Sequence, residues 1–218
     1  KDKLEKVRPN FKPNTKFIVA DLTDLKKVKD TYVILKQENV DILINNAGFG
    51  LLGEFTETDI NEELDMINLN VKAVHVLTKL ILKDMQKKNF GYILNVSSCA
   101  AFGPGPLMAT YYASKAYVET LTESIHEELR RNNSNVVISC LCPGPVNTNF
   151  NNRAGVKKFG VKALEPDYVA KYAIDKMYKG KLIIIPGFTI KLATFMRRFA
   201  PRSLIRRITY NLQDQKRI

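Results

Sequence analysis

Ser98, Tyr111 and Lys115 have residue types and a spacing that would suit acid–base chemistry on a carbonyl group. Tyr111 and Lys115 are four positions apart, so a helix would place them on one face. A free tyrosine has a pKa of about 10, and a neighbouring ammonium group favours the phenolate. We therefore expect Lys115 to lower the pKa of Tyr111 and permit proton exchange near neutral pH. Ser98 would donate a hydrogen bond to an oxygen that gains charge.

The Tyr-x-x-x-Lys pattern alone is a weak signal, because it occurs three times in this chain. The three pairs are Tyr32 and Lys36, Tyr111 and Lys115, and Tyr172 and Lys176. The residue thirteen positions before the tyrosine is Ser98 in the second pair. In the other two pairs it is Val19 and Phe159. We therefore expect the second pair to be catalytic and the other two to lie on solvated helix faces.

Short β-branched runs alternate with longer amphipathic stretches, a pattern typical of βαβ units around a parallel sheet. The predicted strands are residues 16–20, 41–45, 92–96, 136–142 and 181–185. The predicted helices are residues 25–37, 58–87, 110–131 and 166–178. Ser98 follows the third strand and Tyr111 opens the next helix. Because ligands bind outside the carboxyl ends of parallel strands, both side chains should reach one crevice.

Several motifs in this order and spacing resemble the short-chain dehydrogenase/reductase family, classical type. They are Asn45-Asn46-Ala47-Gly48, Asn70, Asn95-Val96-Ser97-Ser98, Tyr111-x-x-x-Lys115 and Pro143-Gly144-Pro145-Val146-Asn147-Thr148. The resemblance runs from about residue 17 to residue 148. It implies a doubly wound parallel α/β sheet, the Rossmann fold, as one domain over residues 1–218. It also implies hydride transfer between NAD(P)(H) and a small carbonyl or alcohol substrate.

The resemblance assigns roles to individual residues. The catalytic set by position is Asn70, Ser98, Tyr111 and Lys115, with Asn70 aligning better than Asn68. In the family the lysine also holds the nicotinamide ribose, and the asparagine completes a water relay. The cofactor-binding positions are Asp21, Asn46, Ala47, Gly48, Tyr111, Lys115, Pro143, Gly144, Val146 and Thr148. Asp21 would touch the adenine, although it could equally be a helix cap.

The phosphate-binding loop of the family, Thr-Gly-x-x-x-Gly-x-Gly, is absent from this sequence. We expect it to precede Lys1, within a βαβ unit of roughly 30 or more residues. Without that unit, interior strand edges would face a gap. The residue that discriminates NAD from NADP would also precede Lys1, and the basic start of the chain slightly favours NADP. Residues 147–164 and 190–218 lack strand character, and we expect them to form the substrate loop and a C-terminal extension.

The formal charge of +12 is mostly scattered along helices, which is typical of solvated surfaces, so we expect no nucleic-acid partner. The exception is the basic C-terminal tail. Four of its apolar residues, Leu192, Phe195, Met196 and Phe199, are expected to pack against the protein body or a partner subunit, with the arginines in water. The alternative is a helix that docks on a membrane surface.

The three cysteines and two histidines have no metal-ligand spacing, so we expect no metal site and a reduced, cytoplasmic protein. Dimers and tetramers are common in the family that the chain resembles, which favours a homo-oligomer. An alternative function is that of a catalytically inactive nucleotide-binding regulator or scaffold with the same fold. The intact serine, tyrosine, lysine and asparagine set argues against that alternative.

Overall fold

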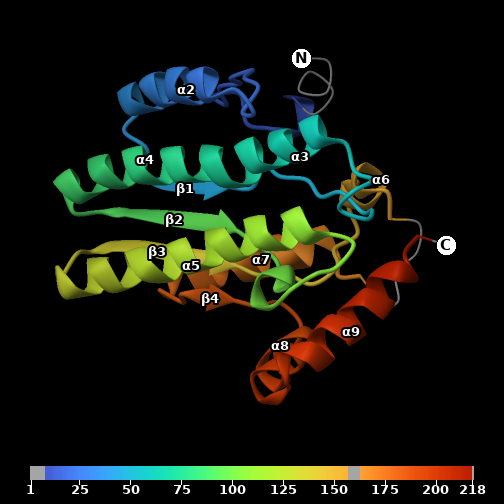
Figure 1. Cartoon of the computed structure of the whole chain (residues 1–218). Coiled ribbons are helices and arrows are strands. Elements are labelled where there is room, and N and C mark those ends of the chain that lie inside the picture. The colour runs from blue at the N-terminus through green and yellow to red at the C-terminus, as the bar shows by residue number, and fades with distance from the viewer. Residues whose placement is uncertain (1–7, 157–162, 218) are drawn as a thin grey trace.

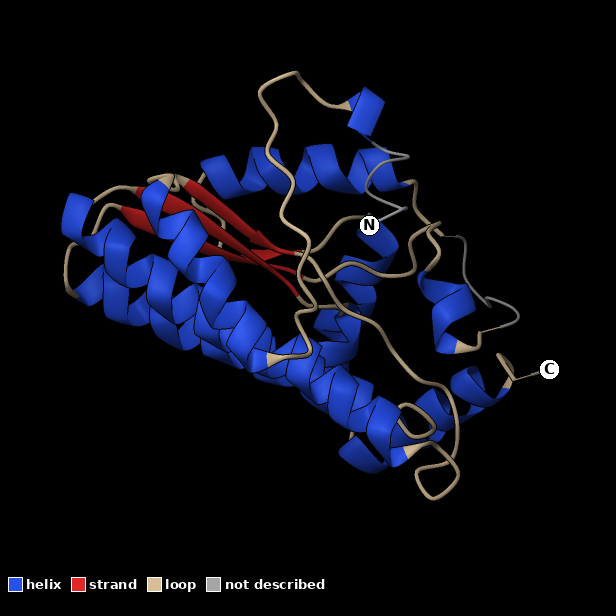
Figure 2. Ribbon diagram, turned by 90° about the horizontal axis from the view of Figure 1, so that it is seen from above, coloured by secondary structure: helices blue, strands red, loops and turns tan. Residues whose placement is uncertain are grey.

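The computed structural model describes residues 8–156 and 163–217, and Figures 1 and 2 show one parallel sheet with helices packed along it. The strands are β1 (Ile42–Asn45), β2 (Gly91–Val96), β3 (Val136–Leu141) and β4 (Ile183–Ile184), in the spatial order β1-β2-β3-β4. All three strand pairs are parallel, and Leu94 lies beside Ser139 in the register of β2 and β3. The predicted parallel α/β fold is confirmed.

Helices cover both faces of the sheet, because successive residues of a strand point to opposite sides. Ile93 belongs to a core with α2 (Leu25–Gln37), α4 (Val74–Lys88) and α5 (Ala109–Arg131). The next residue, Leu94, packs into a second core with α7 (Pro166–Tyr178). The near-continuous apolar character of β2 follows from this burial on both faces.

Two sequence predictions about elements are wrong. Residues 16–20 form no strand, since in the described structure no neighbouring strand pairs with their backbone, and Val19 is 62% exposed. The predicted helix 58–87 is interrupted by a π-helical segment, Asn68–Ala73, between α3 (Ile60–Ile67) and α4. One wide turn shifts the helical register, which apolar periodicity does not reveal.

The two segments without strand character contain short helices. These are α6 (Phe150–Ala154), α8 (Phe188–Met196) and α9 (Arg202–Asp214). Three-residue 3₁₀ helices occur at Arg8–Asn10 and Arg197–Phe199, and a longer one at Cys99–Phe102. Part of the predicted substrate loop, residues 157–162, lies outside the described residues.

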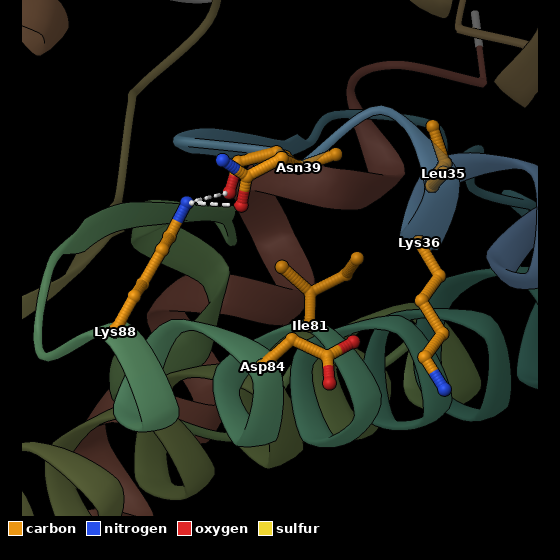
Figure 3. Close-up of a pocket in the computed structure, with 7 residues that line it drawn as sticks. Leu35, Lys36, Asn39, Ile81, Asp84 and Lys88 are labelled. Carbon is orange, nitrogen blue, oxygen red and sulfur yellow. Dashed lines mark hydrogen bonds between the residues drawn. The ribbon is translucent and has the colours of Figure 1, made fainter.

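Lys88, at the end of α4, binds the segment that leads into the amino end of β1. Its ammonium group donates to the Val40 carbonyl oxygen (3.0 Å) and to the side chains of Asn39 (3.3 Å) and Asp41 (2.6 Å). Figure 3 shows the hollow beside this lysine, between α2 and α4. Because it lies at the amino end of β1, it is at the wrong edge of the sheet for the predicted site.

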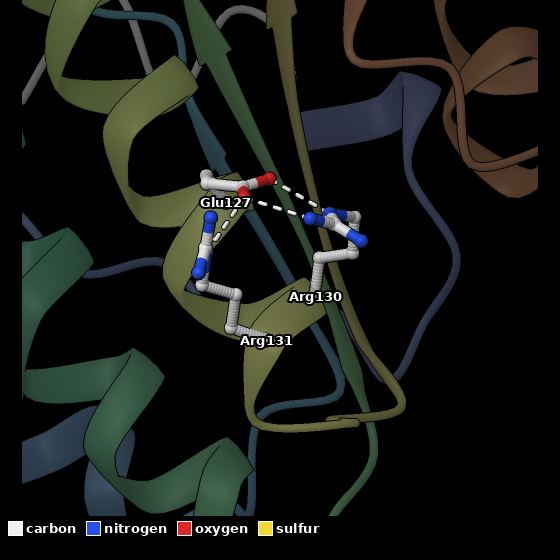
Figure 4. Close-up of polar contacts among 3 residues, drawn as sticks. All are labelled: Glu127, Arg130 and Arg131. Atoms are coloured by element: carbon white, nitrogen blue, oxygen red, sulfur yellow. Dashed lines mark hydrogen bonds and ion pairs between the residues drawn. The ribbon is translucent and has the colours of Figure 1, made fainter.

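The surface of α5 shows how part of the basic excess is accommodated. Near the end of this helix, Glu127 accepts hydrogen bonds from Arg130 (2.7 and 2.8 Å) and Arg131 (2.9 Å), as Figure 4 shows. These bonds lower the pKa of Glu127 to about 2. All three side chains face solvent, so this cluster is a solvated helix face.

Candidate active site

Ser98 and Tyr111 meet at the carboxyl end of β2. Ser98 caps the 3₁₀ helix Cys99–Phe102, where its hydroxyl accepts a hydrogen bond from the Ala100 amide (3.1 Å). The same hydroxyl lies close enough to the phenol of Tyr111, in the first turn of α5, to lower the pKa of that phenol. Both residues therefore lie where strand order and spacing predicted them, at the carboxyl end of β2 and the start of the following helix.

Lys115 is buried one turn after Tyr111. Its ammonium group lies 5.9 Å from the centre of the Tyr111 ring and donates to the Val96 carbonyl oxygen at 2.9 Å. The backbone of Lys115 is also held, because the Ser97 hydroxyl donates to its carbonyl oxygen at 2.7 Å. The end of β2 thus holds both the side chain and the backbone of this lysine.

The pKa of Tyr111 differs from the expectation. Burial raises the pKa of this phenol, and the hydrogen bond from Ser98 only partly opposes the rise. Lys115 does not lower it here, because its ammonium group points to Val96 rather than to the phenol oxygen. Burial also lowers the pKa of Lys115 to about 8, against the opposing effect of Cys140 and Cys142. The pKa values of both groups are strongly shifted, as is common in functional sites.

Asn70 lies in the π-helical segment and is fully buried. Its amide nitrogen donates to the Phe49 carbonyl oxygen (2.9 Å) and to the Ser114 hydroxyl (3.1 Å), and its oxygen accepts from the Phe49 amide (3.2 Å). Asn68, the other candidate, is half-exposed. Asn70 thus joins the loop after β1 to α5.

The loop after β1 passes close to the site. A Cβ atom on Gly48 would lie 2.8 Å from the Asn70 side-chain oxygen and 3.4 Å from the Lys115 nitrogen. A Cβ atom on Gly50 would lie 3.1 Å from the Tyr111 ring. Glycine is required here because the backbone runs directly against the polar side chains.

The predicted cofactor positions lie in the segments that follow the strands. Asn46, Ala47 and Gly48 follow β1 and are exposed. Pro143, Gly144, Val146 and Thr148 follow β3, and the Pro143 carbonyl oxygen accepts from the Cys99 amide at 2.9 Å. Asp21 is exposed, and its carboxylate accepts from the amide and hydroxyl of Thr23 (3.0 and 2.8 Å). These bonds lower its pKa, while the helix cap is Asp24 instead.

A hollow beside the free edge of β1 is compatible with a nucleotide. It is lined by Leu22, Leu43, Ile44, Asn45, Asn46, Ala47, Leu69, Ala73, Val74 and Leu77. Apolar walls with a few amides suit an adenine ring or a ribose. In the described structure, Lys115 uses one of its three N–H donors in a hydrogen bond, to Val96. The residues present therefore fit a nucleotide cofactor.

A buried amide and hydroxyl network behind the site was not predicted from sequence. Asn45 donates to Thr78 (2.9 Å) and to Asn95 (2.8 Å), and Asn95 donates to Thr122 (3.0 Å). The network joins β1, β2, α4 and α5. The sequence did contain a signal for this network, because Asn45 and Asn95 are polar residues within apolar strand runs. Buried polar groups need hydrogen-bond partners, so such residues indicate a buried network.

The model of the short chain dehydrogenase family matches residues 1–158. This chain belongs to the short-chain dehydrogenase/reductase family. The family is the one that the order of its motifs indicated. The other two Tyr-x-x-x-Lys pairs lie outside the family site: Tyr32 donates to Asp84 (2.7 Å), and Lys176 pairs with Asp175 (3.0 Å), both on helix surfaces.

Curated members of the family resemble parts of the chain. An uncharacterized oxidoreductase of Schizosaccharomyces pombe is 40% identical over 133 residues, which cover 60% of this chain and 45% of that protein. Hydroxysteroid dehydrogenase-like protein 1 of Gallus gallus is 33% identical over 138 residues, 59% of this chain and 41% of that protein. The alignments thus span less than half the length of these two relatives.

A solved structure of the family has the same fold. The short-chain dehydrogenase from Sphingobium yanoikuyae, in complex with NADPH, is 25% identical, with a TM-score of 0.74. The similarity covers 85% of this chain and 73% of that one. In residues 8–156 and 163–217 no helix is long and apolar enough to cross a membrane. No group of three His, Cys, Asp or Glu residues gathers there to hold a metal.

Proposed function

We propose that this oxidoreductase transfers hydride between NADP(H) and a small carbonyl or alcohol substrate, with Ser98, Tyr111, Lys115 and Asn70 as its functional set. The observation that carries the proposal is the position of a buried Lys115, whose ammonium group lies 5.9 Å from the Tyr111 ring centre, with the Ser98 hydroxyl near enough to influence the Tyr111 phenol. Two hydroxyls at one point can both bond a single carbonyl oxygen. The proposal takes residues 1–218 as one domain, with the substrate loop and C-terminal extension expected above.

Tyr111 is the proton donor in the reductive direction. Burial raises the pKa of its phenol, so the hydroxyl is protonated at neutral pH and can protonate an alkoxide as that forms. Ser98 donates a hydrogen bond to the same oxygen and stabilises the charge that develops on it. In alcohol oxidation the Tyr111 phenolate would accept the proton of the alcohol hydroxyl. A positive charge nearby favours the phenolate.

Lys115 has two roles in the proposal. Its unused N–H donors would hold ribose hydroxyls of the cofactor, and its charge would stabilise the Tyr111 phenolate during turnover. Asn70 is a positioning residue, because it holds both polar groups of the Phe49 backbone and the hydroxyl of Ser114. It thereby joins the loop beside the cofactor to the helix that carries the tyrosine and the lysine.

The cofactor assignment rests on the residues around the site and on the relative from Sphingobium yanoikuyae, which was solved with NADPH. Asn46, Ala47 and Gly48 line or border the hollow beside β1, where the nucleotide would lie. Pro143, Gly144, Val146 and Thr148 would border the nicotinamide, whose chemistry is hydride donation or acceptance. Asp21 would approach the adenine.

The substrate side of the site is apolar. The Phe150 ring lies 5.4 Å from the Tyr111 ring, and Met66, Met108, Ala154 and Val156 pack in the same cluster. A carbonyl or alcohol with an apolar body fits these surroundings better than a charged metabolite. Phe150 and Ala154 belong to the segment that sequence predicted as the substrate loop.

The test is cofactor-linked turnover by the full-length protein with a panel of apolar aldehydes, ketones and alcohols, followed by absorbance of the reduced nicotinamide. Tyr111→Phe should lower kcat by roughly 10²-fold or more, since it removes the proton donor and little volume. Tyr32→Phe and Tyr172→Phe are matched controls that should remain within a few-fold of wild type. Full activity of Tyr111→Phe would refute the catalytic assignment.

A further inference from the structure

The apolar face of α8 points away from the protein. Phe188, Leu192 and Phe195 of α8 and Phe199 of the following 3₁₀ helix recur three or four positions apart and are 79%, 48%, 52% and 70% exposed. The prediction that Leu192, Phe195, Met196 and Phe199 pack against the body of the chain is therefore wrong, while the alternative, packing against a partner subunit, stays a prediction. In Figure 1, α8 and α9 lie together at the lower edge, beyond β4.

The opposite face of α8 attaches the helix to the body. Ile190 packs so closely on Gly144 that a Cβ atom there would lie 2.7 Å from it. Arg197, just after the helix, donates to the Cys99 carbonyl oxygen at 3.4 Å. An apolar residue and a hydrogen bond thus hold the inner face, while three phenylalanines and a leucine remain outside. This is the reverse of the usual burial pattern of a surface helix.

The next helix, α9, has the same arrangement. Ile205, Thr209 and Gln213 form its buried face, and Gln213 donates to the Tyr112 hydroxyl at 2.5 Å. A second row, four positions apart, remains about half exposed and consists of Leu204, Ile208 and Leu212. Each helix therefore has its own attachment to the body and also an outward apolar row.

Cations accompany these apolar rows. They are the exposed residues Lys191, Arg198, Arg202, Arg206 and Arg207. None of the five has an acidic partner in the part of the chain that the structure describes. Asp214 is the one acid between Phe188 and Arg217, and it pairs with Arg217 at 3.6 Å.

We propose that α8 and α9 dock on an anionic lipid bilayer, lying in the plane of its surface. Exposed phenylalanine and leucine side chains enter the boundary between headgroups and acyl chains, and arginines pair with lipid phosphates. Each basic residue near an anionic leaflet adds roughly a five-fold gain in binding. No helix in the described residues is both long and apolar enough to span the bilayer, which agrees with docking on its surface.

Charge favours lipid over a second copy of this chain as the occupant. A symmetric contact through this face would set the same five cations against their copies, with one acid per chain already paired. Like charges facing each other at an interface oppose association. An anionic membrane supplies many phosphates and an apolar layer within one surface, which matches both features of the patch.

The experiment is co-sedimentation of the full-length protein with phosphatidylcholine vesicles made with and without phosphatidylserine. Binding should require phosphatidylserine and should weaken strongly in about 0.5 M salt. Phe199→Ser should weaken it roughly tenfold, whereas Phe55→Ser, at an equally exposed phenylalanine (69%), should have no effect. Arg206→Gln with Arg207→Gln should weaken it roughly twenty-fold, and Lys26→Gln with Lys29→Gln, a matched loss of charge on α2, should weaken it far less.

Two results would overturn the proposal. One is the absence of pelleting with anionic vesicles. If size-exclusion chromatography then shows a dimer that Phe199→Ser dissociates, the occupant of this face is a second copy of the chain. The other is pelleting to which Phe55→Ser and Phe199→Ser contribute equally, which would indicate attraction by net charge alone. Circular dichroism of each variant checks that the fold is intact. Because all the substituted residues are exposed, the variants should fold like the wild type.

Discussion

The Lys115 ammonium group lies 5.9 Å from the centre of the Tyr111 ring and donates to the Val96 carbonyl oxygen rather than to the phenol. Both side chains are almost fully buried. Burial acts on them in opposite directions, raising the pKa of the phenol and lowering that of the ammonium group. A charge buried in this position lowers the stability of the folded state.

Lys115→Met should change how stability depends on pH. The folded pKa of Lys115 is about 8 and its ordinary value is 10.5. Between these values the unfolded chain binds more protons, so this residue makes the wild type more stable as pH rises. Below pH 8 the full cost is present, on the order of 3 kcal/mol. Thermal melts from pH 7 to pH 10 should show wild type gaining stability relative to Lys115→Met; a difference independent of pH would contradict the shifted pKa.

Ser98→Ala should lower kcat roughly 10²- to 10³-fold with little change in KM, since one donor to the developing alkoxide is lost. Its loss should also alter the pH profile of kcat, because the Ser98 hydrogen bond lowers the pKa of Tyr111. Ser124→Ala, at an exposed serine of α5, is the matched control and should leave both constants unchanged. Steady-state kinetics at saturating cofactor gives the comparison, and a purely KM effect would exclude the proposed role.

Asn70→Leu should destabilise the fold and lower activity together. The change leaves the Phe49 amide and carbonyl groups without their side-chain partner, and each buried unpaired group costs roughly 1–3 kcal/mol. Asn68→Leu, two positions earlier and half-exposed, should be close to wild type in denaturant unfolding. Equal losses in the two variants would contradict a role that belongs to Asn70 and not to Asn68.

Gly50→Ala should reduce activity more than stability. The added Cβ atom would lie 3.0 Å from the Phe150 ring, 3.1 Å from Tyr111 and 3.2 Å from Met108, so the catalytic ring must shift. Gly103→Ala is the control, since its Cβ atom would lie 3.6 Å from the nearest atom, an ordinary contact. A displacement of this kind lowers kcat because proton transfer depends on position. Unchanged kcat in Gly50→Ala would show that the Tyr111 ring need not be held by this loop.

The sequence alone determined the parallel α/β fold and the family, and it predicted which one of three Tyr-x-x-x-Lys pairs is catalytic. Those features depend on local periodicity and on fixed spacings, such as the thirteen residues from Ser98 to Tyr111. Only the tertiary structure showed that residues 16–20 have no strand partner, that a π-helical turn carries Asn70, and that burial raises the pKa of Tyr111. It also showed that the apolar face of α8 points outward. Strand pairing, burial and the direction of a helix face depend on segments far apart in the chain, so local residue patterns do not specify them.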